Sequence, residues 1–372
     1  MKVNKIIIAI MLLLTPALLS GCFNYNDINK LTFVTSIIFD EEDSDKIIVY
    51  VDCIKPYRSS DEGEEKARRI MYKGEGKTAI EALKNVNLIS STRLNYSQNR
   101  AYIFTEKAAK SGIEKYLSLI NNNQQLSIKP DMFIYSGDIS KLLEVSSKDE
   151  EYLGQFLEEL INRNKTNPKA VSANMNDYLS KVIEEDDSFI VGSLKIKEDE
   201  IGEKIELSGG AILKDHKLVS NMNPEDVISY NVLLNNIKDG ILEIANPQND
   251  NGLITVEILG TNVESNIEIE DEKIKLIKNV DLKVTIAEAQ SELIVNDEIL
   301  DYIKEETENL MKDYLVSTFD KFKKEELDIF EVKRLLNINY PKFDIESPLL
   351  NTNLEVNVKV IIDGSSLIKD IL

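Results

Sequence analysis

Few residues in this chain have side chains suited to nucleophilic or metal chemistry. The sequence contains two cysteines, Cys22 and Cys53, and a single histidine, His216. A cysteine nucleophile needs a base within hydrogen-bonding reach, so Cys53 with His216 is the candidate dyad. Cys53 shares one face of a strand-like segment with Ile47 and Val49, which predicts a buried thiol, whereas His216 falls in a predicted exposed turn. We therefore predict that this pair does not form, and a single histidine excludes a multi-histidine metal site.

The segment Gly76–Thr78, Gly-Lys-Thr, invites a nucleotide-binding interpretation, because phosphate-binding loops end in this pattern. Such a loop also needs a glycine five positions before Gly76, where this chain has Met71. Thr78 and Glu81 instead have the spacing of a capping box at the start of a helix. We therefore expect a strand, a turn at Gly74–Gly76 and a helix. The apolar stripe expected on this helix consists of Ile80, Leu83 and Val86.

Acidic residues are abundant, but their spacing indicates no particular site. The runs Asp40–Asp45 and Glu184–Asp187 lack the glycine-turned spacing of a calcium-binding loop. A carboxylate pair for glycoside hydrolysis cannot be singled out among 65 acidic residues, and no G-x-S-x-G elbow occurs. We predict a protein that is not an enzyme, with no catalytic residue, no cofactor and no metal ion.

The other cysteine follows a segment typical of secretion signals. Lys2 and Lys5 precede an apolar run of 14 residues, Ile6–Leu19. This run is shorter than the ~20 residues that span a bilayer, so it predicts a cleavable signal peptide over residues 1–21. The segment Leu19–Cys22, Leu-Ser-Gly-Cys, resembles the lipobox of bacterial lipoproteins. In that class of signals the cysteine thiol takes a diacylglyceryl group and becomes the first mature residue, so Cys22 is the predicted lipidation site. The alternative is an ordinary signal peptide with a cysteine there by chance.

The charge of the chain limits its partners. The formal net charge is -21, and removal of Lys2 and Lys5 with the signal peptide makes it -21 - 2 = -23. Such a surface repels phosphate backbones and anionic lipid headgroups, which argues against nucleic-acid binding. Membrane attachment is therefore expected through the diacylglyceryl anchor, without help from a basic patch. After lipidation only Cys53 remains, so no intrachain disulfide is expected.

The remaining pattern predicts an α+β, multi-domain protein with mixed or antiparallel sheets and helices packed on them. Thr32–Phe39 and Lys46–Ile54 predict a β-hairpin, and Gly209–Val219 predicts a second one turning at Asp215-His216. A long helix is predicted over Asp297–Lys324. The residues expected along one side of this helix are Ile299, Ile303, Leu310, Tyr314 and Phe322. The expected division is a signal peptide (1–21), an N-terminal α/β domain (22–190), a strand-rich middle domain (191–252) and a C-terminal domain (253–372) with a β-meander, the long helix and a closing strand.

The start of the predicted mature chain resembles that of the Ger(x)C lipoproteins, the C subunits of nutrient germinant receptors of bacterial spores. Members of this family usually begin Cys-Trp-Asp-x-x-Glu-Ile. Here Cys22 and Ile28 match, and Phe23, Asn24 and Asp27 stand at the Trp, Asp and Glu positions.

Three later segments are similar to the same family. The helix start GKTAIEALKNV resembles the pattern G-x-T-x-x-E-A through Gly76, Thr78, Glu81 and Ala82. The segment GGAILKDHKLVSNM resembles the family hairpin G-x-A-x-F-K-x-D-K-L-V-G, with Leu213, His216 and Ser220 at the Phe, Asp and Gly positions. The stretch FKKEELDIFEVKRLLNINYPKF resembles the one that follows the long helix. It has Asp328 at the acidic position but lacks the family's earlier Gln.

The resemblance implies a non-enzymatic receptor subunit with three mixed α/β domains. Such lipoproteins lie on the outer face of the spore's inner membrane and act with a polytopic A subunit and a transporter-like B subunit. Germinant recognition is commonly assigned to the B subunit, which leaves direct germinant binding by this subunit open. In this interpretation Cys22 tethers an acidic interaction body beside two membrane partners and so raises its effective concentration.

Two other classes of lipid-anchored protein remain as alternatives. A solute-binding protein of an importer has a similar size and anchor, although repeated βα units and a cleft between two lobes are expected there. A cell-wall enzyme is the second alternative, and the lack of nucleophile, metal and histidine constellations argues against it.

Overall fold

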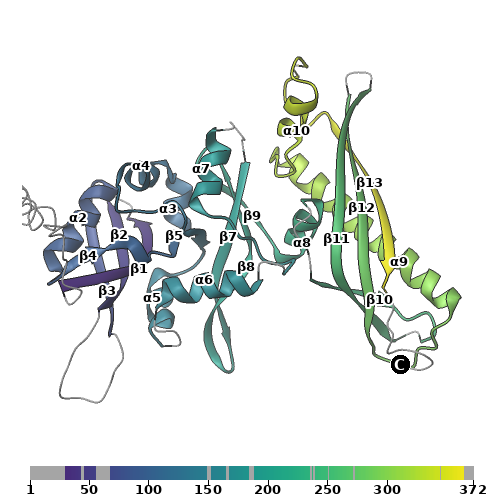
Figure 1. The fold of residues 1–372 in the computed structure, drawn as a ribbon, viewed down its shortest axis with the longest axis horizontal. Coiled ribbons are helices and arrows are strands. Elements are labelled where there is room, and N and C mark those ends of the chain that lie inside the picture. Colours follow the sequence, from purple (N-terminus) through teal and green to yellow (C-terminus); the bar gives the residue numbers. More distant parts are fainter. Residues whose placement is uncertain are drawn as a thin grey trace, which may run out of the picture.

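The structure is a computed structural model that describes residues 30–42, 46–55, 68–148, 152–164, 167–183, 188–234, 237, 239–249, 251–270, 273–343 and 345–363. Two β-sheets organise these residues, and the sheets lie at different positions along an elongated molecule (Figure 1). Helices pack on both sheets, so the expected multi-domain α+β class is confirmed.

The larger sheet has the strand order β3-β2-β1-β5-β6-β7-β8-β9, with β4 paired to β1. Its strands are β1 (Leu31–Glu41), β2 (Ile47–Lys55), β3 (Arg68–Gly76), β4 (Arg93–Asn95), β5 (Ala101–Thr105), β6 (Asp131–Tyr135), β7 (Ser188–Asp199), β8 (Gly202–Lys214) and β9 (Lys217–Met222). The expected β1–β2 pairing is antiparallel. The β8–β9 hairpin turns at Asp215 and His216 as expected. Both have positive φ, 49° and 64°, which a tight two-residue hairpin turn of this kind requires.

Helices cover both faces of this sheet. One face packs against α2 (Ala79–Ile89), α3 (Glu106–Ser111), α4 (Glu114–Asn122) and α7 (Met175–Ile183). The other face packs against α5 (Ile139–Lys148) and α6 (Leu153–Asn164), and a short 3₁₀ helix, η2 (Tyr96–Gln98), follows β4. The central strands are therefore buried on both sides, and every residue of β2 from Ile47 to Cys53 is buried.

A buried carboxylate joins β2 and its two neighbouring strands to α6. Asp52 is fully buried and accepts hydrogen bonds from Thr35 Oγ1 (2.8 Å), Arg69 Nε (2.6 Å) and the backbone N–H of Leu153 (2.8 Å). Gly154 allows this close approach, because a Cβ there would lie 1.9 Å from the carbonyl oxygen of Thr35. The start of α6 is thus fixed to β1, β2 and β3 together.

The turn expected at Gly74–Gly76 is wrong, because these residues belong to β3 and pair with β2. Their lack of side chains serves packing instead. A Cβ on Gly74 would lie 2.1 Å from the Ala82 carbonyl oxygen, so α2 lies directly on the strand. The face of α2 that packs on β3 also differs from the expected apolar stripe. Ala79, Ala82, Leu83 and Val86 are buried, whereas Ile80, expected in the stripe, is 45% exposed.

The second sheet has the order β10-β11-β12-β13. Its elements and the nearby helices are β10 (Ile241–Ala245), β11 (Leu253–Glu270), β12 (Lys273–Ala289), β13 (Thr352–Ile362), α8 (Pro224–Leu233), α9 (Asp297–Lys324) and α10 (Val332–Asn339). The first three strands form an antiparallel meander, as expected. The closing strand β13 pairs parallel with β12, because α9 carries the chain back along the sheet between them.

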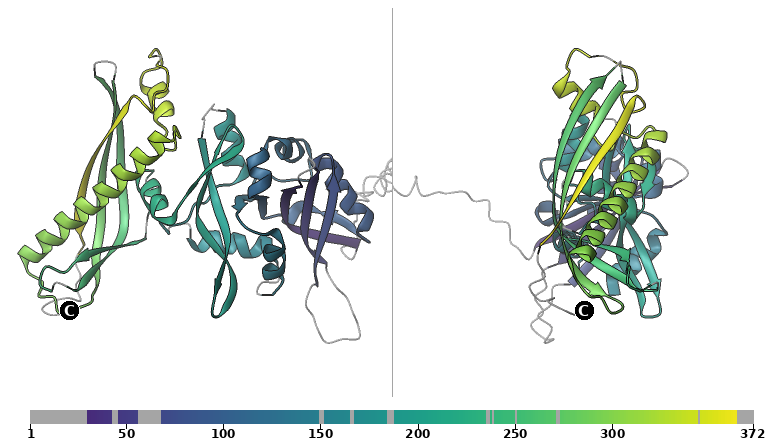
Figure 2. Two further views of the ribbon diagram at one scale, coloured as in Figure 1. Left: turned by 180° about the vertical axis from the view of Figure 1, so that it is seen from behind. Right: turned by 90° about the vertical axis from the view of Figure 1, so that its right-hand side faces the viewer.

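The long helix begins and ends at the expected residues, Asp297 and Lys324. Asn296 caps it by accepting a hydrogen bond from the Ile299 N–H at 2.9 Å. The left view of Figure 2, in which the molecule is seen from behind, shows α9 lying diagonally across one face of the sheet. Its buried stripe consists of Ile299, Ile303, Thr307, Met311, Leu315, Thr318, Phe319 and Phe322. Tyr314, expected in this stripe, is 46% exposed, since the buried positions recur mainly every four residues and place Met311 and Leu315 inward.

Strand pairing differs from the expected domain boundaries at residues 190 and 252. Hydrogen bonding in the larger sheet continues from β6 into β7, β8 and β9, and β10 pairs with the second sheet. The division into parts 22–190, 191–252 and 253–372 stays a prediction. The pairing of the described strands by itself gives two units, one for each sheet.

Candidate functional site

The candidate cysteine–histidine dyad is not assembled. Cys53 is fully buried in β2, and burial, followed by the charge of neighbouring Asp52, raises the pKa of its thiol well above the ordinary range. His216 lies in the β8–β9 turn, where its Nδ1 is 2.6 Å from the Tyr178 hydroxyl. Five strands, β1, β5, β6, β7 and β8, separate β2 from β9 in the sheet order. The thiol is inaccessible, and the imidazole is hydrogen-bonded to a tyrosine of α7.

The Gly-Lys-Thr segment does not form a phosphate-binding loop. The residues before it are extended and paired with β2, so their amides do not converge on one point. Thr78 accepts a hydrogen bond from the Glu81 N–H (3.1 Å), and the Glu81 carboxylate accepts one from the Lys77 N–H (2.8 Å). The amides nearest a hypothetical phosphate are thus used by the helix cap.

The other sequence expectations fall partly outside the described residues. Cys22 and the segment 1–21 lie there, so lipidation and the signal peptide stay predictions. The acidic run Glu184–Asp187 also lies there. Within the described ranges, no group of three or more His, Cys, Asp or Glu side chains is arranged to hold a metal ion. No helix in this part of the chain is both long and apolar enough to cross a membrane.

Asp328 organises the turn that follows the long helix. Its Oδ1 accepts a hydrogen bond from the Val332 N–H at 2.9 Å, and its Oδ2 accepts one from the Lys333 N–H at 2.8 Å. These donors belong to the first turn of α10, whose amides have no partner within the helix. The carboxylate also lies at the positive end of the helix dipole. Asp328 therefore defines where α10 begins.

The β8–β9 hairpin and the segment that follows α9, both of which resemble family motifs, are in contact. Lys214 Nζ, in the β8–β9 hairpin, donates to the Glu326 carbonyl oxygen at 3.0 Å. Ser220 Oγ, in the same hairpin, donates to the Glu325 carboxylate at 2.9 Å. These contacts join segments more than 100 residues apart, since their separations are 112 and 105 residues. The hairpin of the larger sheet is thus attached to the segment after α9.

A second contact between the same parts centres on Glu331. Lys181 of α7 donates to Glu331 Oε1 at 2.5 Å, and Arg334 Nε donates to Glu331 Oε2 at 2.9 Å. Burial raises the pKa of Glu331, but the hydrogen bonds from Lys181 and Arg334 outweigh burial and hold the pKa below its ordinary value. Glu331 has a left-handed backbone with φ of 61°. Lys181 and Glu331 are 150 residues apart, and no local pattern in the sequence indicates this pair.

A buried lysine lies in the second sheet near this contact. Lys278 of β12 is 2% exposed, and its Nζ donates to Ser265 Oγ (2.8 Å) and to the Leu233 carbonyl oxygen (3.2 Å). Burial lowers its pKa to about 8. The lysine links β12 to β11 and to the end of α8, so it belongs to the internal framework of the protein.

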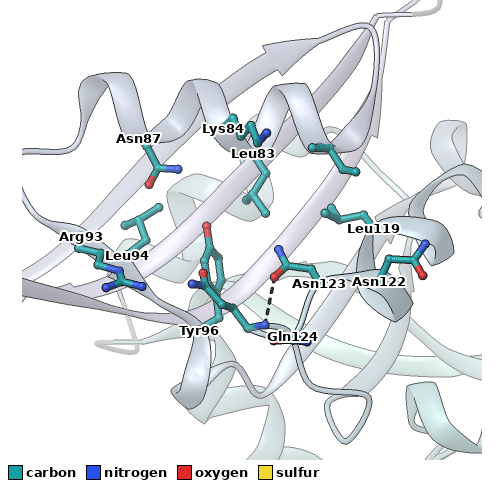
Figure 3. Close-up of a pocket in the computed structure, with 12 residues that line it drawn as sticks. Leu83, Lys84, Asn87, Arg93, Leu94, Tyr96, Leu119, Asn122, Asn123 and Gln124 are labelled. Atoms are coloured by element: carbon teal, nitrogen blue, oxygen red, sulfur yellow. Dashed lines mark hydrogen bonds between the residues drawn. The ribbon is translucent and has the colours of Figure 1, made fainter. Parts of the chain in front are cut away.

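Figure 3 shows a pocket in the larger unit, between α2, α4 and the strand β4. Its volume is about 570 Å³. Leu83, Leu94 and Tyr96 line its inner part, and Asn87, Asn122, Asn123 and Gln124 supply amide groups. Lys84 and Arg93 are the charged residues of its lining, which contains no carboxylate. The pocket therefore suits a neutral or anionic polar group better than a cation.

Comparison with known families accounts for most of this chain. Residues 24–196 match the family model described as spore germination protein N-terminal domain. Residues 208–366 match the model described as spore germination B3/GerAC like, C-terminal. The chain therefore belongs to the Ger(x)C family of spore germination proteins.

Individual relatives agree with this assignment. The chain is 25% identical to spore germination protein GerQC of Bacillus cereus over 248 residues, which cover 67% of each protein. It is 22% identical to putative spore germination protein YfkR of Bacillus subtilis (strain 168) over 324 residues, covering 85% of this chain and 84% of the relative. The crystal structure of the GerBC protein shares the fold, with a TM-score of 0.58 and 15% identity, covering 88% of this chain and 97% of that one.

Proposed function

We propose that this protein is the lipid-anchored, non-enzymatic C subunit of a nutrient germinant receptor of bacterial spores. The observation that carries the proposal is the pair of spore germination family matches, which together span residues 24–196 and 208–366. The subunit supports assembly of the receptor and germination signalling together with two membrane-embedded partners, the A and B subunits. It lies on the outer face of the spore's inner membrane.

A non-enzymatic role agrees with the contacts of the reactive side chains, which are buried or hydrogen-bonded within the protein. The described cysteine is buried, the histidine is bound to Tyr178, and Asp52 is fully occupied by three hydrogen bonds. The residues of the two later family-like segments, including Lys214, Ser220 and Asp328, make contacts inside the protein. These segments therefore serve to hold the two sheets in a fixed relation, as an assembly subunit requires.

Anchoring at Cys22 explains how weak contacts with membrane partners become populated. A diacylglyceryl group supplies two acyl chains, and two chains hold a protein stably on a bilayer where one holds it marginally. Confinement to the membrane raises the concentration of the subunit near its partners without any further contact.

The test is the Cys22→Ala variant, expressed with the two membrane partners from the same locus. Mass spectrometry of the wild-type protein should find a diacylglyceryl-modified Cys22 at the mature N-terminus. The variant should lack this group, leave the membrane fraction and co-purify less with its partners. An unmodified mature N-terminus in the wild-type protein would overturn the anchor. Failure of the wild-type protein to associate with either membrane partner would overturn the receptor role.

A further inference from the structure

The last turn of α2 presents two large apolar side chains to solvent. Leu88 is 82% exposed and Ile89 is 59% exposed. The opposite side of the helix supplies Ala82, Leu83 and Val86 to the core, so the exposed pair contributes little to folding. Adjacent exposed apolar residues of this size are candidates for contact with a partner or with a membrane.

This apolar pair lies beside the start of β1, where the N-terminal segment joins the described structure. The segment that follows Ile89 is held there by three contacts. Lys55 Nζ donates to Ser91 Oγ at 3.3 Å. Thr92 Oγ1 is 2.5 Å from Thr32 Oγ1. Arg93 pairs with Leu31 in the sheet. In Figure 1, α2 and β4 lie at the end of the molecule opposite α9.

The length of chain before β1 limits how far this end can be from a membrane. Cys22 and Lys30 are 30 - 22 = 8 residues apart. Fully extended, eight residues span at most about 28 Å. A diacylglyceryl group on Cys22 therefore keeps the α2 end of the larger sheet within about 28 Å of the bilayer surface.

The charge at this end differs from that of the whole chain. Residues 82–105 contain no Asp or Glu, although the chain has 65 acidic residues in 372. Lys84 and Arg93 lie in this segment and line the pocket of Figure 3, and Lys30 is exposed at the start of β1. Arg100 also lies there, but it pairs with Glu158 at 3.4 Å. The net charge of the whole chain led to the expectation that no basic patch assists the anchor. This end of the molecule, in contrast, exposes basic residues within a segment that has no acidic ones.

We propose that the last turn of α2, with Leu88 and Ile89, rests on the surface of an anionic lipid bilayer, and that Lys30, Lys84 and Arg93 face its headgroups. The proposal rests on the lipid anchor proposed above. Apolar side chains enter the boundary between headgroups and acyl chains, and cations are attracted by anionic headgroups within a Debye length. The lipid anchor thus fixes the orientation of the protein as well as its location. The second sheet is then held out from the bilayer.

The test uses the lipidated full-length mature protein in vesicles of phosphatidylethanolamine and phosphatidylglycerol, without partner proteins. A polarity-sensitive fluorophore is attached at Leu88→Cys, and the matched control carries it at Ile201→Cys, in the β7–β8 turn, where the native side chain is 90% exposed. Cys53 is buried and does not compete for the label. Vesicles containing nitroxide-labelled lipids should quench the fluorophore at position 88 and shift its emission to the blue, with little change at position 201.

Four results separate this proposal from the anchor. Quenching at position 88 that weakens with Lys84→Glu and Arg93→Glu, and with added salt, supports the proposed contact. Protein that floats with the vesicles but shows equal quenching at positions 88 and 201 overturns the contact and leaves the anchor intact. A fluorophore at position 88 that is not quenched in these vesicles, but shifts to the blue once the two membrane partners are reconstituted with the protein, assigns the surface to protein binding and overturns the bilayer contact. Lipidated protein that fails to float with vesicles overturns both.

Discussion

The two sheets of this protein are buried in different ways. The larger sheet has helices on both faces, and β2 is buried without interruption from Ile47 to Cys53. In the second sheet, β12 alternates between buried and exposed residues over much of its length, and α9 packs on the buried face. A sheet covered on two faces gives continuous apolar strands, and a sheet covered on one face gives alternation.

This difference has a consequence for robustness. In the second sheet, one helix of 28 residues supplies much of the cover, so its buried stripe is critical. In the larger sheet, several short helices share the cover, and close backbone contacts such as that of Gly154 position them. The predictions below follow from this contrast.

The largest effect is expected for Phe319→Ala in α9. Phe319 is fully buried, and its ring centroid is 5.3 Å from that of Phe330. Removing the ring leaves a cavity under the helix, and such truncations cost about 3–5 kcal/mol of the free energy of unfolding. Urea unfolding followed by circular dichroism measures the loss. Tyr314→Ala, on the exposed side of the same helix, is the control and should cost less than about 1 kcal/mol. Equal losses in the two variants would contradict the packing described here.

Gly154→Ala should produce a somewhat smaller loss in the larger sheet. The added Cβ meets the Thr35 carbonyl oxygen at 1.9 Å, and backbone atoms cannot move aside without disturbing β1. We expect a loss of about 3 kcal/mol, the upper range for overpacking. Gly260→Ala is the matched control, because a Cβ there has nothing within 4 Å. A Gly154→Ala protein as stable as the Gly260→Ala protein would show that α6 does not approach β1 this closely.

Asp328→Ala tests the connection after α9. Loss of the two hydrogen bonds to the Val332 and Lys333 amides should cost about 2 kcal/mol, as for strong helix caps. Asp328→Asn keeps one acceptor oxygen and should recover part of this stability. Hydrogen exchange should locate the change in α10, with the larger sheet unaffected. Unchanged protection of the α10 amides in Asp328→Ala would be evidence against the capping role.

The smallest effect concerns the buried lysine of the second sheet. Its folded-state pKa of about 8 lies below the ordinary value of 10.5, so between these values the unfolded chain binds more protons than the folded one. Stability contributed through Lys278 therefore rises with pH across this window. Relative to Lys278→Met, the wild-type protein should gain about 1.5 kcal/mol between pH 8 and pH 9.5. Parallel pH profiles for the two proteins would indicate that Lys278 is solvated.

Local signals in the sequence were sufficient for many elements. The apolar periodicity over Asp297–Lys324 predicted α9, and the Asp215-His216 turn and the Thr78–Glu81 cap were likewise recognisable. Features that depend on tertiary contact were not. The role of the Gly74–Gly76 glycines depends on α2 packing against β3, and the outward position of Tyr314 depends on how α9 crosses the sheet.

Long-range polar contacts form the second class of missed features. The Lys181–Glu331 pair joins residues 150 positions apart, and nothing near either residue distinguishes it from the other charged positions.

The exposed Leu88–Ile89 pair is a third feature that the sequence does not indicate. It continues an apolar helix pattern, and its exposure becomes visible only when the buried face of the helix is known. Cys22, the one predicted modification site, depends on a linear motif and lies outside the described residues.

The most direct test of the receptor role is germination of spores that lack this gene, in a strain without a second copy of such a receptor. Germination with one class of nutrients should be lost or slowed, and germination triggered by agents that bypass the receptors should be retained. The wild-type gene should restore the response, and the Cys22→Ala gene should restore it poorly. Normal germination of the deletion strain with every nutrient would contradict the proposal that this protein is a germinant receptor subunit.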